Sequence, residues 1–210
     1  MNGFPSGIIP RLYNTLVMDF KSLNDQDLIT QYLTGKDRAF EELLGRHQQK
    51  IYTSIYLFTK DHSQAEDIFQ EVFIKIIDTL RRGKYNHEGK FLQWAMRISY
   101  NMCVDSFRRH KRRPKVGQTE TFNIFDVLQS PERNAEADMI RSQTHDRVRN
   151  LVDALPPEQR EVVILRHYAD MSFKEIAKLT RVSINTALGR MRYALINMRK
   201  MIDEKQIVLQ

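Results

Sequence analysis

The chain has 210 residues, and its 33 Lys and Arg against 26 Asp and Glu leave a net charge of +7, with a pI near 9.5. A balance this basic makes a polyanion the first partner to consider, and scarce glycine (8) and proline (6) favour helices over a β-sandwich or barrel. The single cysteine, Cys103, excludes an internal disulfide or a multi-cysteine zinc site, which fits a reducing cytoplasmic location. No glycine-rich phosphate loop, HExxH or GxSxG motif occurs, so we expect no cofactor, no metal and no catalytic residue.

Helical periodicity fills two blocks of the chain, about 24–112 and 136–203. Residues 1–23, broken by Pro5 and Pro10, form an N-terminal extension that we expect to be poorly ordered. Between the blocks, residues 114–135 carry turn formers such as Pro114 and Pro131 and are too long for a loop inside a compact domain. We therefore predict an all-α protein with two small helical domains, 24–113 and 136–205, joined by a flexible linker. No apolar run is long enough to cross a bilayer, so we expect no membrane insertion.

The first domain should begin with helices near 25–34 and 37–59, followed by a third over 63–82. The third starts with a Ser63–Glu66 capping box. One face of this helix is apolar, and the other carries acids around a single isoleucine: Asp67, Gln70, Glu71, Ile74 and Asp78. An apolar side chain ringed by acids is typical of a small docking epitope, and a solvated face with one stray isoleucine is the alternative.

The helix over 91–110 indicates nucleic-acid binding. Trp94, Arg97, Asn101 and Arg108 share one face, and the segment 108–115 adds six fixed positive charges in eight residues, including Arg109 and Arg112. Such a cluster binds phosphates with little sequence preference, and aromatic side chains offer stacking surfaces to bases. The preceding loop contributes Lys84, Tyr85 and Lys90. A buried Trp beside a solvated basic tail is the alternative interpretation.

A helix-turn-helix is predicted near the C-terminus, with a short helix over 173–180, a turn at 181–183, and a second helix capped by Ser183. Ile184, Ala187, Leu188, Met191, Ala194, Leu195 and Met198 share the apolar face of the second helix. The opposite face contains no acid, and from Lys174 to Lys200 seven Lys and Arg accompany one acid, Glu175. Such a face suits the major groove of DNA, whereas an ordinary helical hairpin is the alternative. The candidate DNA-contacting residues are Lys174, Ser183, Asn185, Thr186, Gly189, Arg190, Arg192 and Tyr193.

In this order and spacing the segments resemble the small, two-domain extracytoplasmic-function (ECF) sigma factors of the sigma-70 family. The run AEDIFQEVFIK (65–75) is similar to the helix with which the family binds RNA polymerase, which adds Lys75 to that surface. Phe91-x-x-Trp94-x-x-Arg97 with Asn101, Arg108 and Arg109 is similar to the helix that recognises and melts the minus-ten element. Leu155-Pro156, Arg160 and the segment from Glu175 to Arg190 resemble the domain that reads the minus-thirty-five element.

The resemblance implies a subunit that directs core polymerase to promoters and helps to melt the minus-ten region. Its expected partners are the clamp helices of the beta-prime subunit, the flap of the beta subunit, promoter DNA and an anti-sigma factor. An unstacked base would be trapped against Tyr85, Phe91 and Trp94. Four positions depart from the family's pattern: Ala95 replaces Leu, Arg181 replaces Gly in the turn, and Leu188-Gly189 replaces Lys-Ser.

Two other functions are compatible with parts of the sequence. A free-standing helix-turn-helix regulator would bind duplex DNA tightly without polymerase. A metal-dependent nuclease would use Asp67, Glu71 and Asp78, which share a face but have no supporting set of ligands.

Overall fold

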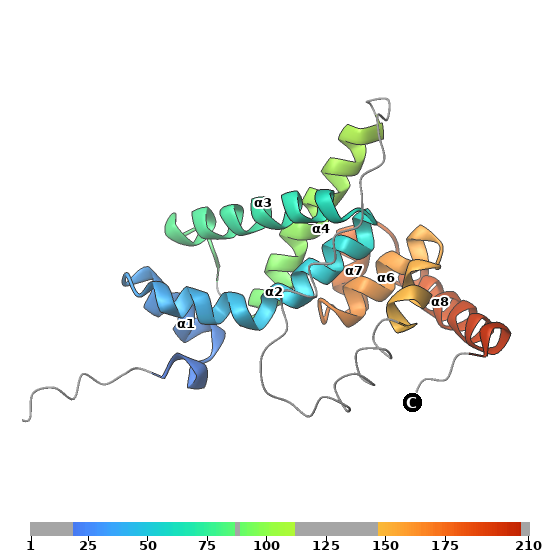
Figure 1. The fold of residues 1–210 in the computed structure, drawn as a ribbon, viewed down its shortest axis with the longest axis horizontal. Helices are drawn as coiled ribbons and strands as arrows, with labels where there is room; N and C mark the ends of the chain where they lie inside the picture. Colours follow the sequence, from blue (N-terminus) through green and yellow to red (C-terminus); the bar gives the residue numbers. More distant parts are fainter. Residues whose placement is uncertain (1–18, 87–88, 112–146, 207–210) are drawn as a thin grey trace, which may run out of the picture.

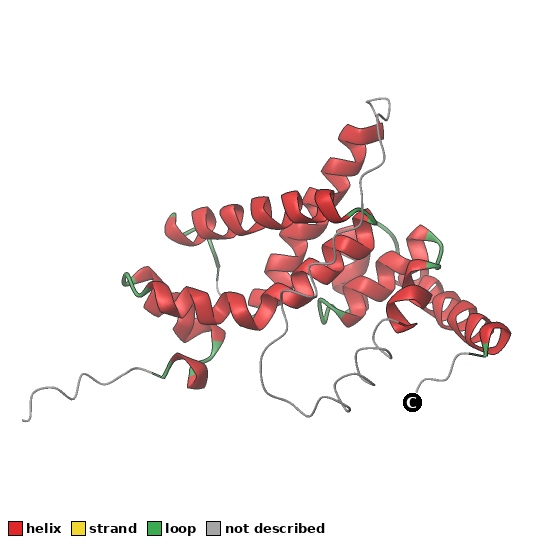
Figure 2. Cartoon of the chain, in the orientation of Figure 1, coloured by secondary structure: helices red, strands yellow, loops and turns green. Residues whose placement is uncertain are grey.

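The computed structural model describes residues 19–86, 89–111 and 147–206 (Figure 1). The described residues form helices and connecting loops, without strands (Figure 2), which confirms the all-helical prediction. The first helical group comprises η1 (Phe20–Ser22), α1 (Asp25–Leu33), α2 (Asp37–Thr59), α3 (His62–Arg81) and α4 (Phe91–Lys111). The second helical group comprises a helical stretch over 147–153, α6 (Pro157–His167), α7 (Phe173–Thr180) and α8 (Ile184–Lys205). The linker predicted over 114–135 lies outside the described residues.

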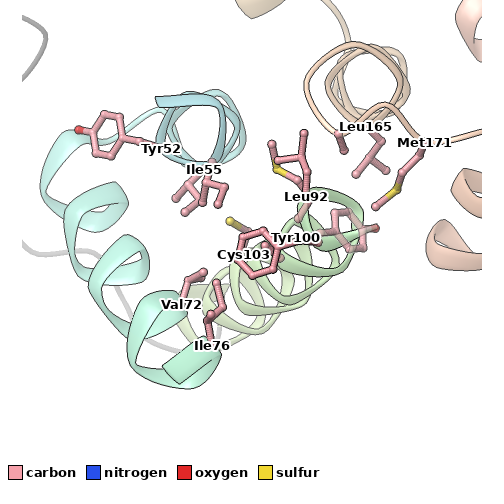
Figure 3. Close-up of a cluster of buried hydrophobic side chains, with 14 of the residues drawn as sticks. Tyr52, Ile55, Val72, Ile76, Leu92, Tyr100, Cys103, Leu165 and Met171 are labelled. Atoms are coloured by element: carbon pink, nitrogen blue, oxygen red, sulfur yellow. The ribbon is translucent and has the colours of Figure 1, made fainter. Parts of the chain in front are cut away.

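Helix α2 is the centre of the first group, because it packs against α1, α3 and α4. Its apolar residues recur at helical spacing and face the apolar stripes of its neighbours. Leu43, Ile51 and Ile55 of α2 are fully buried, as are Val72 and Ile76 of α3. Figure 3 shows Ile55, Val72 and Ile76 converging with Cys103 of α4. This packing fixes the directions in which α3 and α4 present their outer faces.

Two boundaries of the first group differ from the sequence prediction. Helix α3 begins one residue earlier, because Asp61 rather than Ser63 is the N-cap and accepts a hydrogen bond from the backbone N–H of Gln64 at 2.9 Å. The folded unit also begins before residue 24. Arg46 donates to the backbone carbonyls of Phe20, Lys21 and Leu23 at 3.1, 2.9 and 2.6 Å, which fastens η1 to α2.

The second group contains the predicted helix-turn-helix. Ser172 and Glu175 form a capping box at the start of α7, and Ser183 caps α8 by accepting from the N–H of Thr186 at 3.0 Å. Arg181 adopts the left-handed conformation, with φ of 59°, at the position where glycine is the usual residue. The turn geometry is therefore kept despite the side chain.

The apolar face of α8 is less buried than its pattern predicts. Only Ala187 and Ala194 are fully buried, whereas Ile184, Leu188 and Leu195 are 45%, 45% and 48% exposed. Helix α8 packs on α6 and α7 through Ala187 and Ala194, with Met191 and Met198 partly buried beside them. The apolar side chains farther from this edge remain partly in solvent.

The two helical groups are in contact. Leu57 of α2 is buried among Val152, Leu155 and Ile164, and Leu165 and Met171 share a core with α4 (Figure 3). Lys60 pairs with Asp153 at 2.9 Å and Lys90 with Glu175 at 3.2 Å. No helix among the described residues is long and apolar enough to cross a membrane.

Candidate functional site

The outer face of α3 presents Ile74 to solvent within a polar surface. Ile74 is 67% exposed, while the inward-facing Ala65, Val72 and Ile76 are fully buried. Asp67, Gln70, Glu71 and Lys75 surround it and are also exposed. Asp78, at the end of this face, is half-buried and bonds Arg82 at 2.7 Å. Because Ile74 does not contribute to the core, its side chain is available for a partner.

An aromatic cluster lies where the loop after α3 meets α4. The rings of Tyr85 and Trp94 lie 4.4 Å apart between centroids, and the rings of Phe91 and Trp94 lie 5.8 Å apart. Tyr85 and Trp94 are partly exposed, but Phe91 is only 2% exposed and packs against His47. In this conformation Phe91 supports the cluster from beneath, and the reachable aromatic surface belongs to Tyr85 and Trp94.

The polar residues predicted on α4 and its preceding loop are at the surface. Arg97, Asn101, Arg108 and Arg109 are exposed, and Arg108 forms a 3.5 Å ion pair with Asp105. Lys84 and Lys90 are exposed as well, although Lys90 reaches Glu175 of α7. Arg112 lies outside the described residues. The sequence reading missed Phe107, which is 66% exposed beside Arg108 and continues the Tyr100–Cys103 stripe beyond the packed part of α4.

The polar side of α8 that the sequence predicts to face DNA is exposed and free of acids, with one exception. Ser183, Asn185, Thr186, Arg192 and Tyr193 are exposed, as is Lys174 of α7, and Gly189 lies between them at intermediate exposure. Arg190 instead turns toward α6, where its guanidinium donates to Oε2 of Glu161 at 3.2 Å. Of the eight predicted residues, Arg190 is therefore the one held by an intramolecular carboxylate.

Glu161 also connects the two helical groups, a role that the sequence pattern gave no reason to expect. Its Oε1 accepts a 2.7 Å hydrogen bond from the hydroxyl of Tyr100 in α4. Burial raises the pKa of Glu161, against the lowering effects of the Tyr100 hydrogen bond and the Arg190 charge. Burial likewise raises the pKa of Tyr100, which stays a protonated donor.

The environment of Glu175 lowers the pKa of its carboxyl group, in contrast to that of Glu161. The hydroxyl and backbone N–H of Ser172 both donate to its carboxylate, at 2.7 and 2.9 Å, and Lys90 adds a third bond. These interactions, with the Ser172 hydroxyl contributing most, lower the pKa of Glu175 to about 2.

No group of three or more His, Cys, Asp or Glu that could hold a metal ion occurs in the described part of the chain.

Comparisons with known proteins agree with this arrangement. The sequence model of "Sigma-70 region 2" matches residues 43–113, and that of "Sigma-70, region 4" matches residues 145–192. The RNA polymerase sigma-H factor of Pseudomonas aeruginosa is 29% identical, over 79% of this chain and 87% of that protein. The ECF sigma factor SigW of Bacillus subtilis is 24% identical (84% and 95%), and the ECF sigma-E factor of Escherichia coli is 25% identical (88% and 95%).

Solved structures share the fold. CnrH, in complex with the cytosolic domain of CnrY, superposes with a TM-score of 0.54 at 22% identity, covering 86% of this chain and 97% of that one. The sigma factor RpoE, in complex with the anti-sigma factor NepR from Bartonella quintana, gives a TM-score of 0.57 at 15% identity, covering 78% and 96%.

The chain belongs to the sigma-70 family of RNA polymerase sigma factors, and its matches to regions 2 and 4 of that family fall one in each helical group. Within that family it is a member of the extracytoplasmic-function group, and it acts in promoter-specific transcription initiation by RNA polymerase.

Proposed function

We propose that α3 docks the chain on core polymerase, with Ile74 as the apolar anchor and the surrounding polar residues as the rim. The clamp helices of the beta-prime subunit are the partner that the family resemblance implies. The exposure of Ile74 in the free chain supports this role. An energetic hot spot commonly consists of an apolar side chain that becomes buried on binding, inside a rim of polar residues. The contact surface comprises Asp67, Gln70, Glu71, Ile74, Lys75 and Asp78.

The domain formed by residues 24–113 opens the minus-ten region. Tyr85 and Trp94 stack on an unpaired base, and Phe91 keeps the two rings in position from the core side. Lys84, Lys90, Arg97, Asn101, Arg108, Arg109 and Arg112 contact the strand. Unstacking a base costs a few kcal/mol, which aromatic contact and phosphate neutralisation offset.

The domain formed by residues 136–205 places α8 in the major groove of the minus-thirty-five element, and the flap of the beta subunit holds it there. Its exposed acid-free face is the observation that carries this function. To contact DNA, Lys90 must give up its ion pair with Glu175, and Arg190 must give up its ion pair with Glu161. Each cation can then bind a phosphate or a base. The chain works in the cytoplasm and performs no bond-making chemistry itself. It is bound by an anti-sigma factor, a partner that its structural relative RpoE has in the complex with NepR.

The experiment that tests this function is transcription by purified core polymerase from a randomised promoter library, with and without the protein. We expect transcripts that start downstream of a shared two-part motif only when the protein is present. Tight duplex binding by the protein alone, without transcripts, would instead identify a conventional helix-turn-helix regulator.

Polymerase docking is tested separately with Ile74→Ala. Because Ile74 is exposed, the thermal stability should stay within about 0.5 kcal/mol of wild type. Loss of a hot-spot side chain should weaken core binding by roughly 30-fold. Leu33→Ala, at a 52% exposed leucine on α1, is the matched control and should bind core normally.

A further inference from the structure

Gly189 occupies an unfavourable position for glycine. It lies in the interior of α8, where glycine loses more conformational freedom on folding than any other residue. An interior glycine can mark a backbone conformation that other residues disfavour, close packing by another element, or the approach of a ligand to the backbone.

The first two reasons do not apply to Gly189 within the described fold. Its φ is not positive, and α8 continues to Lys205, so Gly189 is neither a turn nor a helix cap. Apart from its two chain neighbours and the adjoining backbone of α8 itself, a Cβ built on Gly189 would meet nothing within 4 Å. The space above Gly189 is open, and a methyl group would fit there without displacing anything in the protein.

The surroundings of Gly189 indicate what enters that space. Its helical neighbours one turn away are Asn185, Thr186, Arg192 and Tyr193, all exposed, and Tyr193 is 61% exposed. Gly189 is thus the lowest point of the exposed polar face of α8, with longer side chains on either side, and we call this position the notch. Thr186 and Tyr193 bring a methyl group and an aromatic ring to this part of the helix.

We propose that this notch receives the methyl group of a thymine in the minus-thirty-five element, so that α8 lies closer to the base edges at Gly189 than elsewhere. The inference rests on the proposed function of α8. The thymine methyl is the apolar group that projects into the major groove, and a position without a side chain admits it while Arg192 and Asn185 reach the flanking phosphates and bases.

The test compares Gly189→Ala with Gly45→Ala in the complete complex with core polymerase. Gly45 also lies inside a helix, α2, and a Cβ there would likewise be in open space. Its neighbours one turn away include Glu41 and Glu42, so unlike Gly189 it lies on an acidic surface that suits no DNA. Both variants should gain helix stability and melt about 2–4 °C higher. Binding to the selected promoter should fall about tenfold or more for Gly189→Ala alone. Equal promoter binding by the two variants overturns the proposal.

A second measurement identifies the occupant. Each thymine of the selected minus-thirty-five element is replaced in turn by deoxyuridine, which removes only the methyl. One replacement should weaken binding by the wild-type complex and leave the Gly189→Ala complex unchanged. If no replacement behaves in this way, the thymine assignment is wrong. Failure of the wild type to select any two-part motif would instead refute the proposed function, so the two failures are distinguishable.

Discussion

The hydroxyl of Tyr100 in α4 donates to one carboxylate oxygen of Glu161 in α6 at 2.7 Å, while the other oxygen accepts from Arg190 in α8 at 3.2 Å. One carboxylate therefore joins the helix assigned to the minus-ten element to the helix assigned to the minus-thirty-five element. Burial raises the pKa of Glu161, so the carboxylate depends on these two partners for its charge.

We expect Tyr100→Phe to weaken the contact between the two helical groups. The variant keeps the ring, which packs edge-on against Phe58, but leaves Glu161 with one fewer donor. The loss should be about 1–3 kcal/mol in the free energy of unfolding by urea, since the bond is to a charged group. The radius of gyration measured by small-angle scattering should rise if the groups separate.

Tyr56→Phe is the control for this change, because the Tyr56 ring stacks on His62 inside the first group. Its unfolding free energy and radius should remain close to those of the wild type. Equal effects from the two variants would show that the Tyr100 hydroxyl contributes nothing specific to the contact.

We expect Arg46 to hold η1, the start of the folded part of the chain, against α2. Its guanidinium bonds three backbone carbonyls in and after η1, together with Glu42 at 3.0 Å, and lysine cannot reproduce that planar fork. Arg46→Lys should cost about 2 kcal/mol or more in stability and accelerate hydrogen exchange at Ser22 and Leu23. Arg82→Lys, at an exposed pair with Asp78, should cost about 0.5 kcal/mol or less, and a comparable loss in both variants would contradict the assignment.

The sequence pattern was sufficient for the helices and for the outward faces of α3 and α4, because amphipathic periodicity encodes which side of a helix is buried. It overestimated the buried face of α8, where Leu188 and Leu195 stay about half exposed. It was insufficient for Arg190 and Phe91. A helical wheel places Arg190 on the polar face, but only the position of α6 shows that Glu161 holds it. Phe91 is the first residue of α4, a position at which a side chain is often exposed. The Phe91 side chain is buried because α2 packs against it through His47. The contact between Tyr100 and Glu161 joins separate helical groups, which local spacing cannot predict.

Glu175 predicts a pH dependence. Because its pKa in the folded protein is about 2, below the ordinary value of 4.5, the carboxylate stabilises the fold above pH 4.5, and that contribution is lost as the pH falls toward 2. Glu175→Gln should therefore be less stable than wild type at neutral pH, and the difference should shrink steadily below pH 4.5. Unfolding in urea at several pH values measures it.

Ser172→Ala separates the cap from the ion pair with Lys90. It removes the hydroxyl that donates to Glu175 and accepts from its N–H, and should cost about 1 kcal/mol at neutral pH. A difference between Glu175→Gln and wild type that persists unchanged at pH 2 would argue against the charge as its source.

Arg181 carries the strain of the helix-turn-helix turn, since a side chain at φ of 59° brings Cβ close to the backbone. Arg181→Gly should relieve about 1–2 kcal/mol of strain and lose about 0.5–1 kcal/mol to the greater flexibility of glycine in the unfolded chain. The net expectation is a slightly higher melting temperature. Lys178→Gly is the matched control, because it removes the same charge from the exposed side of α7 at a helical φ and should destabilise by about 1 kcal/mol. Differential scanning calorimetry should thus give shifts of opposite sign, and two losses of equal size would show that Arg181 is not strained.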